Sequence, residues 1–178
     1  MELLPTLNYW QALGTLLLQI ATIGLGAAFV LRRRNDFAAR LVSWFTPKAL
    51  WIAFALSLLA SFMTLVYSEY LGIEPCPLCW WQRIFLYPQV ILFGMAAWKR
   101  DTYIADYALI LSVFGAGVAL YQHALQMLPG SGLPCPATGA SCAQRFLFEF
   151  GYITYPLMAF TLFAFLIVTA LVVRARKA

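Results

Sequence analysis

The chain has 178 residues, of which 63% are hydrophobic and 11% charged, with a formal net charge of +5 and a mean hydropathy of +0.79. Soluble domains carry about a quarter charged and about half apolar residues, so this composition excludes a soluble globular enzyme, a disordered tail and a nucleic-acid-binding module. A spanning helix needs about 20 apolar residues, and the length therefore allows four to six spans in one integral membrane domain.

Runs without charged residues predict five spanning helices. Pro5 and Asn8 place the start of the first helix near Asn8. The third run, Ile84 to Trp98, is too short to span a membrane at about 1.5 Å per residue, so its helix should begin near Pro77 and include Arg83. The predicted spans are residues 8–31, 49–68, 77–98, 107–128 and 150–173.

Nearly all basic residues fall on one side of this arrangement. Segments 32–48, 99–106 and 174–178 hold ten of the 12 Lys and Arg residues, and five spans place all three segments on the same side of the membrane. An even number of spans would distribute these basic residues over both sides. Because basic loops stay in the cytoplasm, the N-terminus is predicted outside and the C-terminus inside. Within segment 32–48, four apolar residues at helical spacing fit a short helix lying in the cytoplasmic membrane interface, with a plain loop as the alternative. These residues are Phe37, Leu41, Trp44 and Phe45.

All four cysteines fall on the predicted outer side, where disulfides persist. Cys76 and Cys79 lie between spans two and three, and Cys135 and Cys142 lie between spans four and five. Pairing within each loop is the first choice among three possible connectivities. For Cys135 and Cys142, a structural staple and a redox role both remain open. A zinc site is disfavoured, because the six-residue gap between these two is too wide for one of its cysteine pairs.

The Cys76-X-X-Cys79 pair favours exchange chemistry. Its small ring removes little entropy from the unfolded chain, and such rings are typical of reactive thiols. Pro77 is suited to the first position of a helix, which places Cys79 in the first turn, where free N–H groups and the helix dipole stabilise a thiolate. Arg83 follows four residues later on the same helix face. A buried cation at the membrane edge is usually functional, with extension of the side chain to the lipid headgroups as the alternative.

Electrons from such thiols need an acceptor. The chain has no glycine-rich dinucleotide fingerprint, and its one histidine, His123, leaves no pair of axial haem ligands. A lipid-soluble quinone is the two-electron acceptor that a bilayer supplies. Arg83 and His123, both near the outer edge, can donate hydrogen bonds to a quinone oxygen. Alternatively, His123 is a packing residue within an apolar helix and has no role in a binding site.

Together these motifs resemble the signature of the DsbB family of disulfide-forming quinone reductases, and in particular its BdbC-like branch. The resemblance extends over roughly residues 50–173. It rests on CPLCWWQRIFLYP at residues 76–88, YQH at 121–123, CAQR at 142–145 and FGYITYPL at 150–157.

The resemblance implies an all-α integral membrane protein whose core, residues 49–178, is a DsbB-like four-helix transmembrane bundle. Since that core has four spans, residues 1–48 form an extra N-terminal transmembrane helix and a basic, amphipathic cytoplasmic loop. It also implies a multi-pass protein of the bacterial cytoplasmic (inner) membrane, with the cysteine loops on the periplasmic or extracytoplasmic side.

The same resemblance implies a disulfide relay. Cys135 would form a mixed disulfide with a DsbA-like thioredoxin-fold thiol oxidase, Cys142 and Cys76 would exchange, and Cys79 would be the thiolate facing the quinone. The cysteines at 135 and 142 are closer in sequence than in some relatives.

Arg83 and His123 carry over as quinone-site residues, with ubiquinone or menaquinone as the cofactor. A DsbA-type partner is a strong oxidant, at about −120 mV, so its reoxidation needs an acceptor of higher potential than nicotinamide. The expected partners are this oxidase and the lipid bilayer, with no nucleic acid and no metal.

Two other functions stay open. A VKOR-like or reductive thiol:quinone relay would also use a Cys-X-X-Cys pair beside a quinone, but that family places the pair near the end of its last core helix, whereas Cys76 and Cys79 open a helix in mid-chain. A membrane scaffold stapled by two disulfides predicts inert disulfides and an effect of Arg83→Ala on stability alone.

Overall fold

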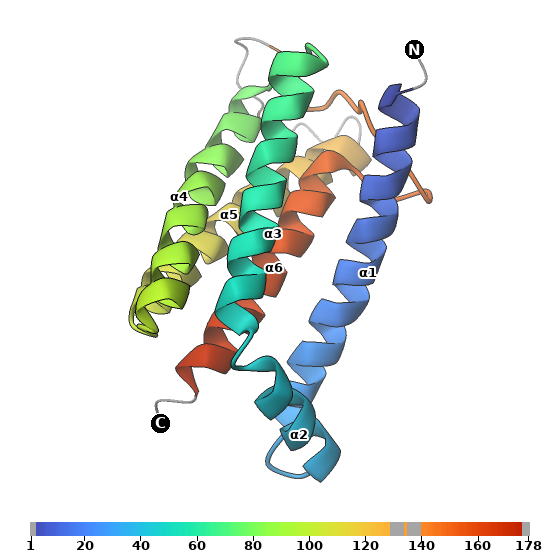
Figure 1. Cartoon of the computed structure of the whole chain (residues 1–178). Coiled ribbons are helices and arrows are strands. Elements are labelled where there is room, and N and C mark those ends of the chain that lie inside the picture. Colours follow the sequence, from blue (N-terminus) through green and yellow to red (C-terminus); the bar gives the residue numbers. More distant parts are fainter. Residues whose placement is uncertain (1–2, 129–133, 135–139, 176–178) are drawn as a thin grey trace.

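Six α-helices and one π-helical turn make up the regular structure of the described residues, 3–128, 134 and 140–175 of this computed structural model (Figure 1). Apart from one isolated bridge between Glu149 and Ile153, the described part contains no β-structure, which confirms the all-α prediction. The helices are α1 (Leu3–Leu31), α2 (Asp36–Phe45), α3 (Ala49–Leu65), α4 (Pro77–Lys99), α5 (Ile104–Met127) and α6 (Tyr155–Arg174), and the π-helix η1 (Val66–Tyr70) continues α3.

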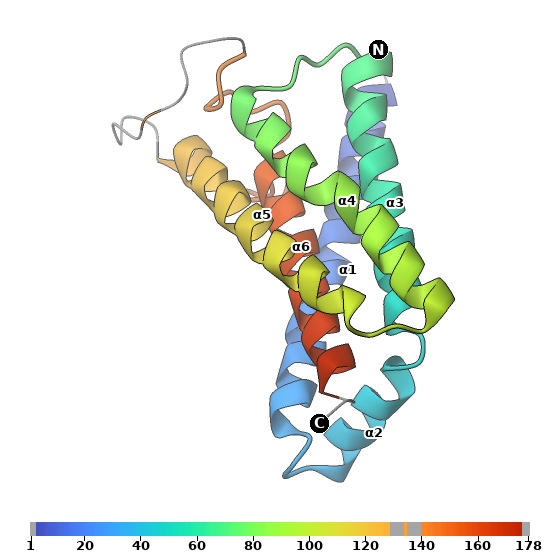
Figure 2. The same ribbon diagram turned by 90° about the vertical axis from the view of Figure 1, so that its left-hand side faces the viewer.

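Four helical segments of the described chain are long and apolar enough to cross a membrane. They are Leu4–Leu31, Ala49–Tyr70, Ile104–Met127 and Tyr155–Arg174. The remaining long helix, α4, has 23 residues but carries polar side chains along its length, among them Gln82, Arg83 and Gln89. It begins at Pro77, as predicted for the third span, and packs against both α3 and α5 (Figure 2).

The helix boundaries differ from the sequence prediction at two places. α1 begins at Leu3 rather than near Asn8, because Pro5 is tolerated in a first helical turn, where backbone N–H groups lack helical partners. α6 begins at Tyr155 rather than near residue 150. The preceding residues, Phe150 (φ 52°) and Gly151 (φ 77°), form a left-handed turn. The hydroxyl oxygen of Thr154 then caps α6 by accepting a hydrogen bond from the Leu157 N–H.

The short helix predicted after the first span is present as α2. The side chain of Asn35 caps it by accepting hydrogen bonds from two backbone N–H groups. Ala38, Val42 and Phe45 are buried against the bundle, and the Phe45 ring meets Phe165 of α6 edge to face. Phe45 was predicted to share the interfacial face with Phe37, Leu41 and Trp44. That part of the prediction is wrong, because the 3.6-residue period turns Phe45 toward α6.

The contact between α5 and α6 is close enough to require a glycine. A Cβ atom at Gly115 would lie 2.5 Å from the Phe163 ring, whereas Gly117 faces open space. Between α4 and α5 the link is polar, since the buried Gln89 amide donates to the Ala108 carbonyl and to the Ser112 hydroxyl. Gly115 and Gln89 therefore hold α5 between its two neighbours.

The extra helix α1 packs along α6 (Figure 1) and is fixed near its start by buried polar contacts. The Asn8 side-chain oxygen accepts hydrogen bonds from the hydroxyls of Tyr67 (2.8 Å) and Tyr155 (3.0 Å). Further along, Gln19 donates to the hydroxyl of Thr161. These contacts make α1 part of the bundle and not a loosely tethered anchor.

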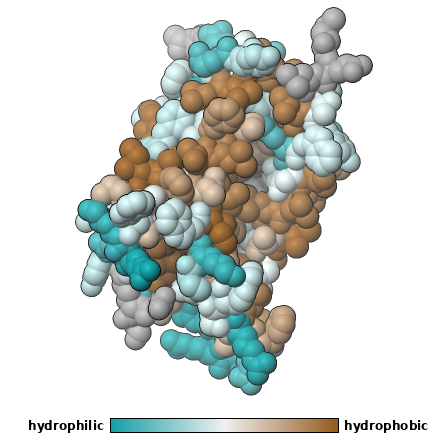
Figure 3. Space-filling model, in the orientation of Figure 1, coloured by the Kyte–Doolittle hydropathy of each residue, from teal (hydrophilic) through white to brown (hydrophobic). Residues whose placement is uncertain are grey.

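The two ends of the bundle differ in character. The start of α1, the connection from η1 to α4 and the segment before α6 lie at one end, and α2, the α4–α5 connection and the end of α6 lie at the other (Figure 1). The three basic segments thus meet at one end, as predicted, as far as the chain is described. Apolar side chains cover the middle of the surface seen in Figure 3, and hydrophilic ones gather toward the lower end.

Candidate redox-active site

Cys76 and Cys79 are placed by the start of α4. Cys76 is the N-cap residue in an extended conformation (φ −67°, ψ 164°), and Pro77 occupies the first turn, as predicted. The Cys76 sulfur accepts a hydrogen bond from the Cys79 N–H at 3.3 Å, so it takes the place of the oxygen of a usual capping residue. The Cys76 and Cys79 Sγ atoms lie 2.7 Å apart, within reach of a disulfide bond.

A glutamine from α5 contacts both sulfur atoms. The side-chain Nε2 of Gln122 lies 3.1 Å from the Cys76 Sγ and 3.4 Å from the Cys79 Sγ, and Gln122 is almost fully buried. Gln82, one turn after Cys79, donates to the Gln122 Oε1 at 2.7 Å. This bond orients the amide so that its NH2 group faces the sulfurs. Sequence reasoning did not single out Gln122, and its only signal was a polar side chain beside His123 within an apolar helix.

Cys142 is buried next to this pair. Cys76, Cys142 and Leu125 form one cluster of buried residues, and Cys79 packs against it. The buried Gln126 on α5 holds the Cys142 segment by donating to the backbone carbonyls of residues 142 and 144. The structure thus brings three of the four predicted cysteines together.

The fourth predicted cysteine, Cys135, lies outside the described residues. Its neighbour Pro134 is described, and the Pro134 carbonyl accepts a hydrogen bond from the Tyr121 hydroxyl at 2.7 Å. Tyr121 comes from the same helix as Gln122, so the end of α5 contacts the connection on which Cys135 stands as well as the Cys76–Cys79 pair.

The surroundings of the two sulfurs favour negative charge on Cys79. Hydrogen bonding with Cys79 and burial raise the pKa of Cys76, which precedes α4. The Cys79 sulfur lies instead in the first turn of α4, where the helix dipole favours an anion, and both the Gln122 amide and the Arg83 charge act in the same direction. Cys79 is therefore the better leaving group when the Cys76–Cys79 disulfide is attacked. In the reduced pair, it is the better electron donor.

Arg83 is held inside the bundle. It is 7% exposed, its Nη2 donates to the Thr64 carbonyl of α3 at 2.8 Å, and its guanidinium lies 5.1 Å from the centroid of the Trp80 ring. The Thr64 hydroxyl also bonds the Tyr87 hydroxyl at 2.9 Å. Thr64 stands just before the π-helical turn η1, a distortion often found at functional sites. The side chain is thus directed at α3 and not extended toward lipid headgroups.

His123 is directed at α6. Its Nδ1 lies 2.9 Å from the hydroxyl of Thr154, the buried N-cap residue of that helix. The Thr154 oxygen also accepts from the Leu157 N–H, and its hydroxyl can either donate to Nδ1 or accept from it, according to the His123 tautomer. No hydrogen bond joins His123 to Arg83 within the described residues, and the two side chains contact different helices.

Among the described residues, no three His, Cys, Asp or Glu side chains lie close enough to hold a metal ion. What the cluster offers is thiol chemistry: a dithiol pair at a helix start, with Cys76 buried and Cys79 half-buried, a third buried cysteine beside it and an oriented amide. Such a pair can exchange with another disulfide or pass on two electrons.

Comparison with known proteins supports this chemistry. The family model described as disulfide bond formation protein DsbB matches residues 47–173. The chain belongs to the DsbB family. Probable disulfide formation protein C 1 of Bacillus cereus is 36% identical over 130 residues, covering 72% of this chain and 94% of the relative. The probable disulfide formation protein of Chlamydia trachomatis is 39% identical over 128 residues, covering 72% and 92%.

Disulfide bond formation protein C of Bacillus subtilis is 32% identical over 129 residues, covering 72% of this chain and 94% of the relative. No solved structure matches the chain. The resemblance to the BdbC-like branch is confirmed, and the family assigns this chain a disulfide-forming oxidoreductase role. Its bacterial relatives and its four apolar helices fit a multi-pass membrane protein. Residues 1–46 lie outside the matched region.

Proposed function

We propose that this DsbB-family protein reoxidises a DsbA-like thioredoxin-fold protein outside the cytoplasm and passes the electrons to a membrane quinone, ubiquinone or menaquinone. The observation that carries the proposal is the buried cluster that Cys142 shares with Cys76 and Leu125, at the start of a helix that also holds Arg83. A scaffold stapled by inert disulfides would not need an amide directed at both sulfurs of the Cys76–Cys79 pair.

The relay begins at the connection between α5 and α6. A thiolate of the reduced partner attacks Cys135 of a Cys135–Cys142 disulfide and forms a mixed disulfide. The second partner thiol then displaces Cys135, so that the partner leaves oxidised. Two electrons and two protons now reside on Cys135 and Cys142.

Exchange then proceeds inward. The Cys142 thiolate attacks Cys76 of a Cys76–Cys79 disulfide, and Cys79 leaves as a thiolate. The position of Cys142 against Cys76 supports this step, as does the environment that stabilises negative charge on Cys79. Cys135 next displaces Cys76 from Cys142 and restores the first disulfide. The electron pair has moved to Cys76 and Cys79.

Arg83 and His123 are the proposed quinone-binding residues, and their donors fit such a group. Within the described residues, Arg83 uses one of its N–H groups on the Thr64 carbonyl, so other donors of this buried guanidinium are available to a quinone oxygen. In the tautomer whose Nδ1 accepts from Thr154, a neutral His123 carries an Nε2–H that can donate to a quinone oxygen. A bound quinone supplies a two-electron, two-proton acceptor. Arg83 stabilises the negative charge that develops on the oxygen it binds.

A coupled assay tests the proposal. The purified full-length protein is mixed with a soluble quinone analogue and a reduced thioredoxin-fold protein, and quinone absorbance and partner thiols are followed together. The proposal predicts one partner disulfide formed for each quinone reduced, with no quinone loss in Cys79→Ser. Partner reduction at the expense of quinol would instead establish a reductive relay. Partner oxidation without quinone loss would overturn the assignment of the acceptor.

A further inference from the structure

The end of the bundle opposite the cysteines carries positive charge that the protein does not neutralise. Segment 32–48 contains five cations and a single acid, Asp36. In the part of the chain that the structure describes, none of these cations forms an ion pair, and the one salt bridge at this end joins Arg174 and Asp106, outside the segment. The cations are Arg32, Arg33, Arg34, Arg40 and Lys48.

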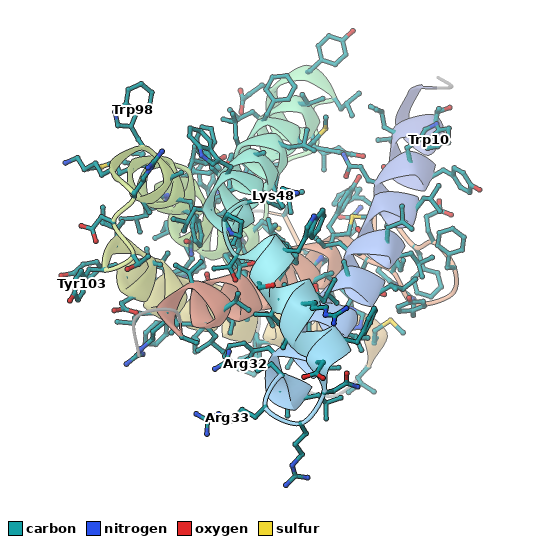
Figure 4. All side chains as sticks on the ribbon, turned by 60° about the horizontal axis from the view of Figure 1, so that its bottom comes forward. Trp10, Arg32, Arg33, Lys48, Trp98 and Tyr103 are labelled. Atoms are coloured by element: carbon teal, nitrogen blue, oxygen red, sulfur yellow. The ribbon has the colours of Figure 1, made fainter. Side chains whose placement is uncertain are left out.

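Two of these arginines line a pocket. The turn after α1, the helix α2 and the end of α6 border an open pocket of about 620 Å³. Figure 4 looks at this end of the molecule and shows Arg32 and Arg33 beside α2. Its basic wall comes from these two residues, and Val42, Pro47 and Val172 give it an apolar wall. The Arg32 guanidinium is held 3.9 Å from the centroid of the Phe29 ring, which fixes its position at the pocket.

The outer face of α2 is apolar and unpartnered. The exposed fractions of the Phe37 and Trp44 side chains are 74% and 62%, and Leu41 between them is also exposed. Lys48 lies over the Trp44 ring at 3.7 Å. Apolar side chains beside Lys and Arg on a helix along the bundle end are typical of a helix at the level of the lipid headgroups.

We propose that the pocket between α1, α2 and α6 binds the phosphate of an anionic phospholipid, with the carbons next to the phosphate against Val42, Pro47 and Val172. The guanidinium groups of Arg32 and Arg33 match a phosphate in charge and donor geometry. A free phosphate would use only the basic wall, whereas a phospholipid also uses the apolar one. The pocket is built by residues between 32 and 47 and by the end of α6, far along the bundle from the cysteines, so it goes beyond the disulfide-forming activity and is independent of it.

Native mass spectrometry of the full-length protein in detergent tests this site. Phosphatidylglycerol and phosphatidylcholine are titrated against the wild type, Arg32→Gln/Arg33→Gln and Arg34→Gln/Arg40→Gln. The third protein is a matched control, because it loses the same charge from exposed residues of the same segment that do not line the pocket. Since Arg32 packs on Phe29, Arg33→Gln alone is included, and the melting temperature of each variant is recorded.

The expected result is that the wild type prefers phosphatidylglycerol and that the pocket variant loses affinity about thirtyfold, equivalent to about 1 kcal/mol for each arginine. Arg33→Gln should show part of this loss. The control should stay within about twofold, because Arg34 and Arg40 do not line the pocket and their exposed charges are screened by solvent. Equal binding of both lipids, or equal losses in the pocket and control variants, would overturn the proposal. So would displacement of the lipid by millimolar inorganic phosphate, which would indicate a site for a free anion.

Discussion

Gln122 is the residue through which α5 acts on the Cys76–Cys79 pair. Its amide reaches both sulfurs, and its oxygen is occupied by Gln82. A hydrogen bond to a charged acceptor contributes about 1.5–3 kcal/mol, more than one to a neutral thiol. The amide therefore stabilises the form of the reduced pair in which Cys79 is a thiolate more than it stabilises the form in which both thiols are neutral.

Replacing Gln122 by Ala is expected to slow alkylation of Cys79 in the reduced protein at pH 7 about tenfold, because the thiolate loses a charge-assisted hydrogen bond. Modification of Cys79 is followed by mass spectrometry. Gln126→Ala is the matched control, since Gln126 stands one turn later and contacts the backbone at residues 142 and 144. Equal slowing in both variants would contradict a specific role of the Gln122 amide.

Arg83→Gln is expected to raise the apparent KM for a quinone analogue about tenfold or more, because it removes a charge-assisted donor from the proposed site. Trapping of the partner as a mixed disulfide should change little. Thr64→Ala is a suitable control, since it keeps the carbonyl that Arg83 contacts and removes the hydroxyl bonded to Tyr87. Equal loss of quinone reduction and partner trapping in Arg83→Gln would contradict the division of roles.

The chemistry of the site was more predictable than its geometry. The spacing of Cys76, Cys79 and Arg83 and the position of Pro77 are local, so a single helix start fixes them. The partners of these residues are not local. Which polar residue of α5 faces the sulfurs depends on how α4 and α5 are rotated against each other. That Arg83 turns to a backbone carbonyl of α3 depends equally on the neighbouring helix.

At the scale of elements, apolar run length predicted the number and order of the helices but not all their ends. Residues 150–154 are largely apolar, as in a span, yet two left-handed residues, Phe150 and Gly151, delay the helix to Tyr155. Composition does not reveal backbone conformation at such a turn. The amphipathic pattern did predict α2, because its period is a property of one helix, although the partner of Phe45 became evident only from the position of α6.

The contact between α5 and α6 gives a prediction for glycine replacement. Gly115→Ala is expected to destabilise the protein by about 1–3 kcal/mol, because the new methyl group overlaps the buried Phe163 ring. Gly117→Ala, two residues away and facing open space, should be neutral or slightly stabilising. Thermal unfolding in detergent compares the two. A Gly117→Ala melting temperature as low as that of Gly115→Ala would contradict this account of the packing.

The molecule as a whole separates two kinds of chemistry. The described cysteines, Gln122 and Arg83 lie toward one end of the bundle, and the basic segments with α2 lie at the other. The long helices α1, α3, α4, α5 and α6 alternate in direction along the bundle, so that the start of α1 and the end of α6 lie at opposite ends (Figure 1). Helix α1 brings Arg32 and Arg33 to the basic end.

Reporter fusions test the orientation that the basic residues predict. Alkaline phosphatase, which needs an oxidising compartment to form its disulfides, should be active when fused in the connection between η1 and α4 and inactive after residue 178. A cytoplasmic fluorescent reporter should give the reverse pattern. Phosphatase activity at the C-terminus would contradict the predicted orientation and would place the cysteine pair on the reducing side.

The most direct measurement isolates the last step of the relay. A Cys135→Ala/Cys142→Ala variant, which keeps Cys76 and Cys79, is reduced and mixed without oxygen with a soluble quinone analogue. The account predicts two thiols lost for each quinone reduced in a single turnover, and no quinone loss in Cys76→Ala/Cys79→Ala, which keeps the other pair. Quinone reduction by the second variant and none by the first would contradict the assignment of Cys76 and Cys79 as the electron exit.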